Sequence, residues 1–275
     1  MDIRRYIKIK KKAIDAALDR YLPPAKTTPG VIHRAMRYAV FSGGKRIRSV
    51  LTIASFEACG GKGNLVMPIA CAIELIHTYT LVHDDMPCMD DDDLRRGKLT
   101  CHKKFNESLA LLAGDALLTF GFQLFSEGGN IEIVREISRA VGSQGTIGGQ
   151  VVDIEGSRLK AQSSKRIIKK SELDYIARNK TGALFEAACK SGAILSNASG
   201  KKVQAFGDFG RNLGITFQLV DDLIDKDGYV NIYGADHVEK MASLLNKRAG
   251  ESLKIVGKAG IRLSEIAELI LHRKS

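Results

Sequence analysis

The segment 67–86 constrains the fold most, because it is apolar on nearly every side when it is written as a helix. A helix of this kind must lie inside other structure, since no face of it suits water. Pro87 ends the helix, because proline lacks an amide donor and clashes with the preceding turn. Asp84 and Asp85 stand in its last turn, so a buried helix delivers carboxylates to its C-terminal end. We expect the loop after Pro87 to return Asp90 towards Asp84.

Helical spacing of apolar residues recurs along the rest of the chain and predicts a series of helices. These are expected at about 2–22, 31–42, 47–58, 67–86, 105–125, 130–147, 171–192, 202–225, 235–255 and 260–273. The polar, lysine-rich segment 156–170 is predicted to be a connection. We find no strands with period-two alternation and no repeat of 20–50 residues. The predicted fold class is all-α, as a single-domain helical bundle over residues 1–275.

Charge and cysteine content narrow the class of protein. The formal net charge is +11, but the basic residues are scattered, so a polyanionic small substrate explains the charge at least as well as nucleic acid. The five cysteines lack paired CxxC spacing, so neither a disulfide framework nor a zinc site is expected. The first residues form no signal segment, and no run of 18 apolar residues occurs. We expect a cytoplasmic protein with no membrane span and no nucleic-acid partner.

The stretch His83–Lys98 places six aspartates directly before basic residues. Carboxylates this dense repel one another, so a folded protein tolerates them best where cations neutralise them. Mg²⁺ suits such oxygen ligands and prefers one or two carboxylates together with substrate phosphates. Arg95 and Arg96 add planar donors for phosphate oxygens. The stretch therefore predicts a site for a metal-bridged phosphate ester, with a solvated acidic loop as the alternative.

A second acidic cluster and a basic turn strengthen this prediction. Asp221 and Asp225 share one face at the end of the helix predicted over 202–225, with Asp222 beside them. Acidic residues are unfavourable at a helix C-terminus, so three together indicate a compensating cation. Residues 43–48, G-G-K-R-I-R, place basic side chains at a helix start, where anions bind; a capped helix with surface charge is the alternative.

With these motifs the chain resembles the trans-isoprenyl diphosphate synthases, especially the bacterial farnesyl diphosphate synthases. The resemblance runs from residue 43 to the final helix. D-D-M-P-C-M-D at 84–90 is similar to the family's first aspartate-rich motif in its longer bacterial form. The other matching blocks are G-D-A-L at 114–117, G-G-Q-V-V-D at 148–153, K-T-G-A-L at 180–184 and F-Q-L-V-D-D-L-I-D at 217–225.

The resemblance implies a central active-site cavity and assigns roles to individual residues. About three Mg²⁺ ions would be bound with an allylic diphosphate, and their ligands, facing one another across the cavity, would be Asp84, Asp85, Asp90, Asp221, Asp222 and Asp225. Arg95 and Lys180 would contact that diphosphate. Isopentenyl diphosphate would bind Lys45, Arg48, His77 and Arg96. Thr181 and Gln218 would line the reacting region. The family usually forms homodimers, and we expect one here.

The implied reaction is head-to-tail prenyl transfer. Isopentenyl diphosphate would condense with dimethylallyl or geranyl diphosphate to give (E,E)-farnesyl diphosphate and diphosphate. Tyr79 and Thr80 lie about one helical turn before Asp84. In the family a bulky aromatic residue at the fifth position before the motif floors the product pocket, so Tyr79 favours a C15 product. The alternative is that Tyr79 packs in the core and faces away from the pocket.

The match to the family fails after Asp225. Relatives usually continue through roughly twenty residues, including G-K-x-x-G-x-D, before K-x-T-Y-P; here Asp225 runs directly into K-D-G-Y. We interpret Lys226 as the start of a K-x-T-Y remnant and count it among the substrate-binding residues. Three explanations compete: a short lid, a lost activity in a partner subunit, or a mobile loop that the sequence omits. We favour the last, because every other block is intact.

Three other functions remain open. A geranylgeranyl diphosphate synthase differs in product length. A terpene cyclase would share the acidic clusters but would not need the basic site at Lys45, Arg48 and His77, so their presence counts against it. A non-catalytic subunit of a heteromeric prenyltransferase would explain the absent lid, and turnover by the purified protein alone distinguishes it from an enzyme.

Overall fold

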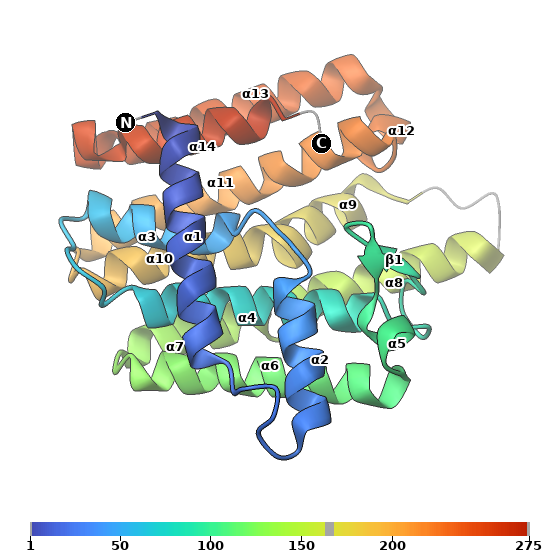
Figure 1. The fold of residues 1–275 in the computed structure, drawn as a ribbon. Coiled ribbons are helices and arrows are strands. Elements are labelled where there is room, and N and C mark those ends of the chain that lie inside the picture. Colours follow the sequence, from blue (N-terminus) through green and yellow to red (C-terminus); the bar gives the residue numbers. More distant parts are fainter. Residues whose placement is uncertain (1, 163–167, 274–275) are drawn as a thin grey trace. The chain divides into compact units, whose positions relative to one another are not determined.

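The computed structural model describes residues 2–162 and 168–273, and its regular structure is almost entirely helical (Figure 1). The chain divides into two compact units, Met1–Ile53 with Gly63–Ile131 and Ala54–Lys62 with Glu132–Ser275. The prediction of an all-α fold is confirmed. The prediction that residues 1–275 form a single domain stays a prediction.

The first unit is built on two long helices, α4 (Met67–Asp84) and α6 (Glu107–Glu127), which pack along each other. Helices α1 (Ile3–Tyr21) and α2 (Gly30–Phe41) cross this pair (Figure 1). The remaining elements are the start of α3 (Ile47–Ala58), β1 (Leu94–Arg95), β2 (Lys98–Leu99) and α5 (Cys101–Lys104). As its composition predicts, α4 is buried along most of its length.

Local signals in the sequence set the ends of these helices. The Asp2 carboxylate accepts a hydrogen bond from the Arg5 amide at 3.3 Å and caps α1. The Asn106 side chain accepts one from the Leu109 amide at 2.8 Å and caps α6. Helix α4 ends at Asp84, three residues before Pro87, so the acidic loop begins where the sequence predicts.

The second unit surrounds α11 (Gly200–Asp225), which lies between α10 (Ala183–Leu195) and α13 (Ala235–Ser252) (Figure 1). A π-helix, η1 (Ala177–Gly182), leads directly into α10. The other elements are α7 (Ile131–Val141), α8 (Thr146–Gln162), α9 (Lys170–Ile176), α12 (Tyr229–Tyr233), the 3₁₀ segment η2 (Leu253–Gly260) and α14 (Ile261–Leu271).

Glycines on two helices make room for η1. A Cβ atom added at Gly149 of α8 would lie 2.2 Å from the amide nitrogen of Lys180. A Cβ atom added at Gly214 of α11 would lie 2.7 Å from the Cα atom of Gly182. Both distances are far below van der Waals contact, so α8 and α11 approach η1 closely only because these positions lack side chains.

The structure differs from the sequence predictions in several places. The helix predicted over 130–147 is interrupted at 142–145, so α7 and α8 are separate helices, and the short helix α5 was not predicted. Helix α8 runs to Gln162, so the predicted connection 156–170 is wrong at its start, and residues 163–167 lie outside the described residues. The hairpin β1–β2 was missed, because two-residue strands are too short to show an alternating pattern. Its turn, Arg96-Gly97, has positive φ at both residues (54° and 74°), as tight hairpins require. The short helix α12 was also missed.

Among the described residues, α6 is the one helix long and apolar enough to cross a membrane, judged by length and composition alone. Of its most apolar 18-residue window, 39% is buried. Its contacts with α4, α2 and α5 make it a core helix of the first unit.

A charged cluster in the second unit gives a pH-dependent contribution to stability. Glu186 accepts hydrogen bonds from Arg211 (2.8 Å to each oxygen) and pairs with Lys190 at 2.9 Å. Burial alone would raise the pKa of Glu186, but the hydrogen bonds from Arg211 and Lys190 outweigh it and hold this pKa below its usual value. The ion pairs therefore stabilise the fold above the unfolded-state pKa, and this stabilisation is lost as the pH falls through the lower folded-state pKa.

We expect Glu186→Gln to reduce the free energy of unfolding by roughly 1–3 kcal/mol at pH 7, because Arg211 and Lys190 lose a charged acceptor. Denaturant melts of both proteins from pH 7 downwards check this. The two curves should converge once the pH lies below the folded-state pKa of Glu186. A gap that stays constant with pH would contradict the assignment.

Candidate active site

The first unit contains all four residues predicted to bind isopentenyl diphosphate. A guanidinium nitrogen of Arg48 lies 3.3 Å from Nε2 of His77 on α4. Arg96, in the turn of the hairpin, donates to the Gly43 carbonyl at 2.7 Å. Lys45 follows Gly44 in the same turn and is exposed. The basic turn, α4 and the hairpin thus contribute to one cationic cluster.

This cluster has the electrostatics of an anion site. Burial and the nearby charge of Arg48 lower the pKa of His77 well below its ordinary value, and Arg96 adds to the effect. Burial also lowers the pKa of Arg96. Cations held this close repel one another, and a diphosphate between them would relieve the repulsion.

The first acidic motif begins at the end of α4 and folds back on itself. The amide of Asp90 donates to the carbonyl of Asp84 at 2.9 Å, so the loop returns as predicted. Asp85 is buried and forms an ion pair with Arg95, which also pairs with Asp92 at 3.2 Å. Burial raises the pKa of Asp85 although Arg95 opposes the effect.

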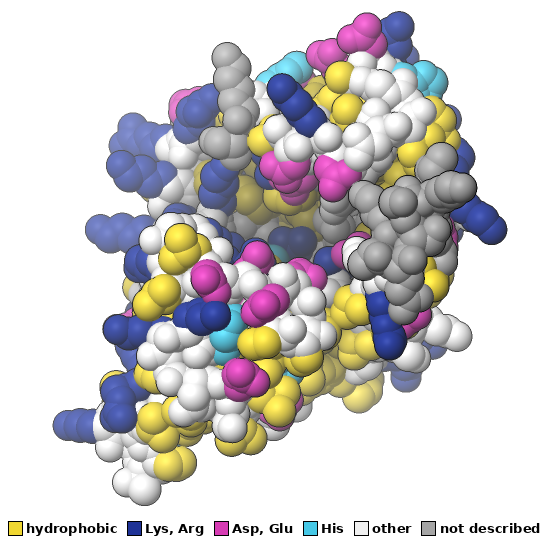
Figure 2. All heavy atoms as spheres, turned by 90° about the vertical axis from the view of Figure 1, so that its right-hand side faces the viewer, with side chains coloured by type: hydrophobic (Ala, Val, Ile, Leu, Met, Phe, Trp, Pro, Cys, Tyr) yellow, Lys and Arg dark blue, Asp and Glu magenta, His cyan; other side chains and the backbone are white. Residues whose placement is uncertain are grey.

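Figure 2 shows acidic, lysine and arginine side chains exposed at the surface. Within the first unit, Asp85, Arg95 and Arg96 line one small cavity of about 30 Å³ together with Glu74. A predicted metal ligand and two predicted diphosphate contacts therefore meet at the C-terminal end of α4. The sequence order explains this, because the hairpin follows the acidic loop immediately.

The second unit joins the residues predicted to line the reacting region. Lys180 and Thr181 both lie in η1, a helix type that often occurs at functional sites. The Lys180 ammonium pairs with Asp153 of α8 at 2.6 Å. The Thr181 hydroxyl donates to the Gln218 side-chain oxygen at 2.9 Å, and the Gln218 amide donates to Asp222 at 2.9 Å.

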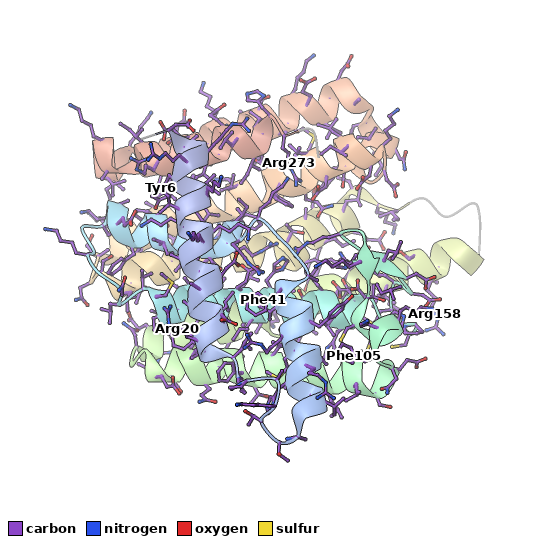
Figure 3. The ribbon with its side chains drawn as sticks, viewed as in Figure 1. Tyr6, Arg20, Phe41, Phe105, Arg158 and Arg273 are labelled. Atoms are coloured by element: carbon purple, nitrogen blue, oxygen red, sulfur yellow. The ribbon has the colours of Figure 1, made fainter. Side chains whose placement is uncertain are left out.

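Asp221, at the end of α11, holds a cation supplied by the chain itself. Arg273, labelled in Figure 3, lies 2.5 Å from the Asp221 carboxylate and stacks on the Phe217 ring at 3.6 Å. Burial raises the pKa of Asp221, against the effect of Arg273, and Asp225 raises it further. Burial and Asp225 thus destabilise the charged form of Asp221, and an additional cation nearby would stabilise it.

Asp222 has partners for both carboxylate oxygens. One oxygen accepts from Gln218, and the other accepts from the Tyr229 amide at 2.8 Å. The short connection makes this possible: Lys226 takes a left-handed conformation (φ 57°) and Gly228 has φ 56°. A Cβ atom at Gly228 would lie 2.2 Å from an Asp222 oxygen, so glycine is needed there. Lys226 therefore ends α11.

Tyr79 and Thr80 lie near the end of α4, where the product pocket is predicted. Tyr79 is buried, and its hydroxyl has no hydrogen-bond partner in the part of the chain that the structure describes. Its ring packs edge-on against His83 at 5.8 Å. Burial, with a smaller effect of Asp84, raises the pKa of Tyr79 to about 12. The Thr80 hydroxyl donates to the His77 carbonyl at 2.9 Å.

The acidic side chains suit Mg²⁺ as partial ligand sets. Within residues 2–162 and 168–273 there is no group of three or more His, Cys, Asp or Glu side chains that could hold a metal ion. Mg²⁺ is usually bound by one or two carboxylates and completes its shell with water and phosphate oxygens. The hard oxygen donors at Asp84 and Asp90 in the first unit, and at Asp221 in the second unit, are therefore of the type that Mg²⁺ takes when it binds together with a diphosphate.

Sequence reasoning missed three side chains of these clusters. Arg46 is buried beneath the basic turn, Asp153 pairs with Lys180, and Arg273 pairs with Asp221. Asp153 ends the G-G-Q-V-V-D block, which was a usable signal. Nothing in the sequence alone links Arg273 to Asp221, because the two residues are far apart along the chain.

Solved structures with this fold define the class of protein. A crystal structure of an FPP/GFPP synthase from Zymomonas mobilis matches with a TM-score of 0.90 and 32% identity, over 98% of each chain. A putative farnesyl-diphosphate synthase from a Marinomonas species matches with a TM-score of 0.86 and 32% identity, over 98% of this chain and 99% of that chain. The fold is that of the helical isoprenyl diphosphate synthases.

Sequence comparison gives the family. The family model described as Polyprenyl synthetase matches residues 29–249. The farnesyl diphosphate synthase of Geobacillus stearothermophilus is 38% identical over 236 residues, covering 83% of this chain and 77% of the relative. The heterodimeric geranylgeranyl pyrophosphate synthase large subunit 1 of Arabidopsis thaliana, a chloroplastic protein, is 41% identical over 261 residues, covering 92% of this chain and 66% of the relative. The chain belongs to the polyprenyl synthetase family.

Proposed function

We propose that this protein is a trans-prenyltransferase that condenses isopentenyl diphosphate with dimethylallyl or geranyl diphosphate, giving farnesyl diphosphate. The contact between Arg48 and His77, with Arg96 held against the same basic turn, is the observation that carries the proposal. A cationic site of this kind is what a second diphosphate substrate requires. A terpene cyclase, which takes one diphosphate, has no use for it.

The family uses Mg²⁺ to bind the allylic diphosphate, and we propose Asp84, Asp90 and Asp221 as its main ligands here. When bound, Mg²⁺ supplies positive charge to the departing diphosphate. Arg95 and Lys180 add donors on the same group. Arg95 is already paired with Asp85, and Lys180 with Asp153. When a diphosphate binds, each cation must therefore either share its charge between the carboxylate and the phosphate or exchange one for the other.

The side chains of the protein promote the reaction at carbon by holding and orienting the two substrates. The allylic C–O bond breaks, the isopentenyl double bond attacks C1, and a proton is lost to form the new trans double bond. Lys45, Arg48 and Arg96 hold the isopentenyl diphosphate so that its double bond meets C1. The oxygen atoms of Thr181 and Gln218 are proposed to stabilise the allylic cation, which also needs a cavity free of water. No side-chain nucleophile is required.

Product analysis tests this proposal. The purified protein is incubated with Mg²⁺, radiolabelled isopentenyl diphosphate and either dimethylallyl or geranyl diphosphate, and the products are dephosphorylated and sized. A C15 alcohol supports a farnesyl diphosphate synthase. A C20 alcohol supports a geranylgeranyl diphosphate synthase, for which relatives of similar identity also exist. No product from folded protein would overturn the enzyme and favour the non-catalytic subunit.

We expect Tyr79→Ala to lengthen the product from C15 towards C20. Tyr79 is buried one turn before Asp84, and its hydroxyl makes no hydrogen bond within the described residues, so its removal opens space without breaking a polar contact. The assay above, run with Tyr79→Ala, measures the change. Tyr79→Phe keeps the ring and should keep C15. An unchanged product from Tyr79→Ala would mean that this residue packs away from the pocket.

We also propose a homodimer in the cytoplasm. Helix α6 exposes Leu111 (47%) and Leu112 (54%), an apolar surface that a second copy of the chain would cover. One relative is described as the large subunit of a heterodimeric enzyme. The alternative is therefore a heterodimer, in which a different protein covers this surface. Sedimentation of the purified protein separates the two, since a monomer without added partner would argue against the homodimer.

A further inference from the structure

The basic turn 43–48 contains one arginine that does not face solvent. Arg46 is 4% exposed, while its neighbour Lys45 is exposed. Arg46 donates to Glu74 at 2.9 Å, to Asp15 at 2.8 Å and to the Val40 carbonyl at 2.6 Å. The three acceptors come from α4, α1 and α2. Arg46 therefore ties the turn to three helices of the first unit at once.

The backbone of the turn depends on this anchor. Gly43, Gly44 and Arg46 all have positive φ (128°, 116° and 56°). Glycine adopts such angles readily, but arginine rarely does, and a residue held there needs surrounding contacts that fix it. The buried hydrogen bonds of the Arg46 side chain supply those contacts.

Glu74 connects the anchor to the predicted substrate site. It is 2% exposed, and its second oxygen accepts from the Ser49 hydroxyl at 2.9 Å. Glu74 lies three residues before His77 on α4, so both side chains project from one face of the helix. Arg46 contacts Glu74 and Arg48 contacts His77, so two successive points of α4 hold the second half of the turn.

The charge of Arg46 is also neutralised by carboxylates of the protein itself. Glu74 and Asp15 both pair with it, and Lys11 pairs with Asp15, so two cations meet two carboxylates. Burial alone would lower the pKa of Arg46, but the charges and hydrogen bonds of Glu74 and Asp15 together outweigh burial and raise this pKa. The Arg46 side chain is thus already neutralised by these carboxylates.

We propose that Arg46 is a positioning residue for the isopentenyl diphosphate site: with Glu74 it fixes the turn 43–48 on α4 and so sets where Lys45 and Arg48 stand relative to His77. The inference rests on the proposed function of these residues. A buried ion pair is seldom more stabilising than well-packed apolar side chains of similar volume. Fixing the geometry of the turn explains why this pair is present.

The test replaces the pair rather than breaking it. In Arg46→Met/Glu74→Met, Asp15 keeps Lys11 and the Ser49 hydroxyl keeps the Ala70 carbonyl at 2.8 Å. Arg96 loses the attraction of Glu74 but keeps the Gly43 carbonyl at 2.7 Å. We expect the KM and the Kd for isopentenyl diphosphate to rise about tenfold or more, since charged contacts to phosphate depend strongly on geometry. The KM for geranyl diphosphate should change less than about twofold. Arg46→Lys keeps the charge but lacks the planar guanidinium, so its Kd for isopentenyl diphosphate should lie between those of the wild-type protein and the double variant.

Equilibrium dialysis with radiolabelled isopentenyl diphosphate measures the Kd without turnover. The control is Arg211→Met/Glu186→Met, which removes a more exposed arginine–glutamate pair in the second unit while Lys190 keeps Glu136 at 3.1 Å and Asp208 keeps the Gln204 amide at 3.0 Å. This control should change the melting temperature but not the Kd. A folded Arg46→Met/Glu74→Met protein with wild-type Kd would overturn the positioning role. Absence of binding by the wild-type protein would instead overturn the proposed function together with it.

Discussion

Asp84→Asn is expected to lower kcat/KM by on the order of a thousandfold. Asp84 ends the buried helix α4, and its carbonyl accepts the Asp90 amide, so the variant side chain stays in place while its charge is removed. Asparagine has the same shape but is a much poorer ligand for a hard cation. The apparent affinity for Mg²⁺ should fall as well. Steady-state rates over a series of Mg²⁺ concentrations measure both effects.

Asp91→Asn is the matched control for this variant. Asp91 lies in the same loop, is exposed and has φ 53°, a conformation that asparagine adopts readily. Its rate should remain within about twofold of the wild-type rate, as expected of a surface substitution. If Asp84→Asn were equally mild, with circular dichroism showing a folded protein, Asp84 would not be a metal ligand.

Gly149→Ala is expected to destabilise the second unit strongly, because the added methyl group would overlap the backbone of η1. The new Cβ atom would lie 2.2 Å from the Lys180 amide nitrogen and 2.7 Å from its Cα atom, so α8 and η1 must separate. Overpacking of this kind costs about 1–3 kcal/mol. The melting temperature should fall by about 2–4 °C for each kcal/mol. Because Lys180 itself moves, the KM for geranyl diphosphate should also rise.

Gly156→Ala gives the opposite result on the same helix. A Cβ atom at Gly156 meets nothing within 4 Å, so the added methyl group lowers the entropy of the unfolded chain without a clash. The free energy of unfolding should rise by about 0.4–1 kcal/mol. Denaturant melts of the two alanine variants compare them directly. Equal effects at both positions would show that the contact between α8 and η1 is not tight.

The sequence predicts α4 and α11 well, since a long apolar segment ending at a proline and an acidic helix end are both local signals. It also predicts that the chain turns back after Pro87, as the contact between Asp90 and Asp84 confirms. The hairpin at 94–99 could not be predicted in this way, because its two-residue strands are held by pairing and not by an apolar pattern.

The contacts of the site were harder to predict than its residues. Arg46 looks like one more surface cation of a basic turn, although it is buried. Glu74 gave the one usable signal, since it is the only Asp, Glu, Lys or Arg between Met67 and His83. A buried carboxylate demands a partner, but which of the many basic residues supplies it depends on the tertiary fold.

The π-helical turn η1 has a consequence for how insertions and deletions act on this chain. A π-turn is equivalent to one extra residue in an α-helix, so α9 and α10 are out of phase by that residue. Deleting a single residue from Ala177–Gly182 would restore a regular helix but rotate one flank by about 100° relative to the other. Either Leu173 would leave the core or Lys180 and Thr181 would face elsewhere. The segment therefore tolerates substitution far better than a change in length.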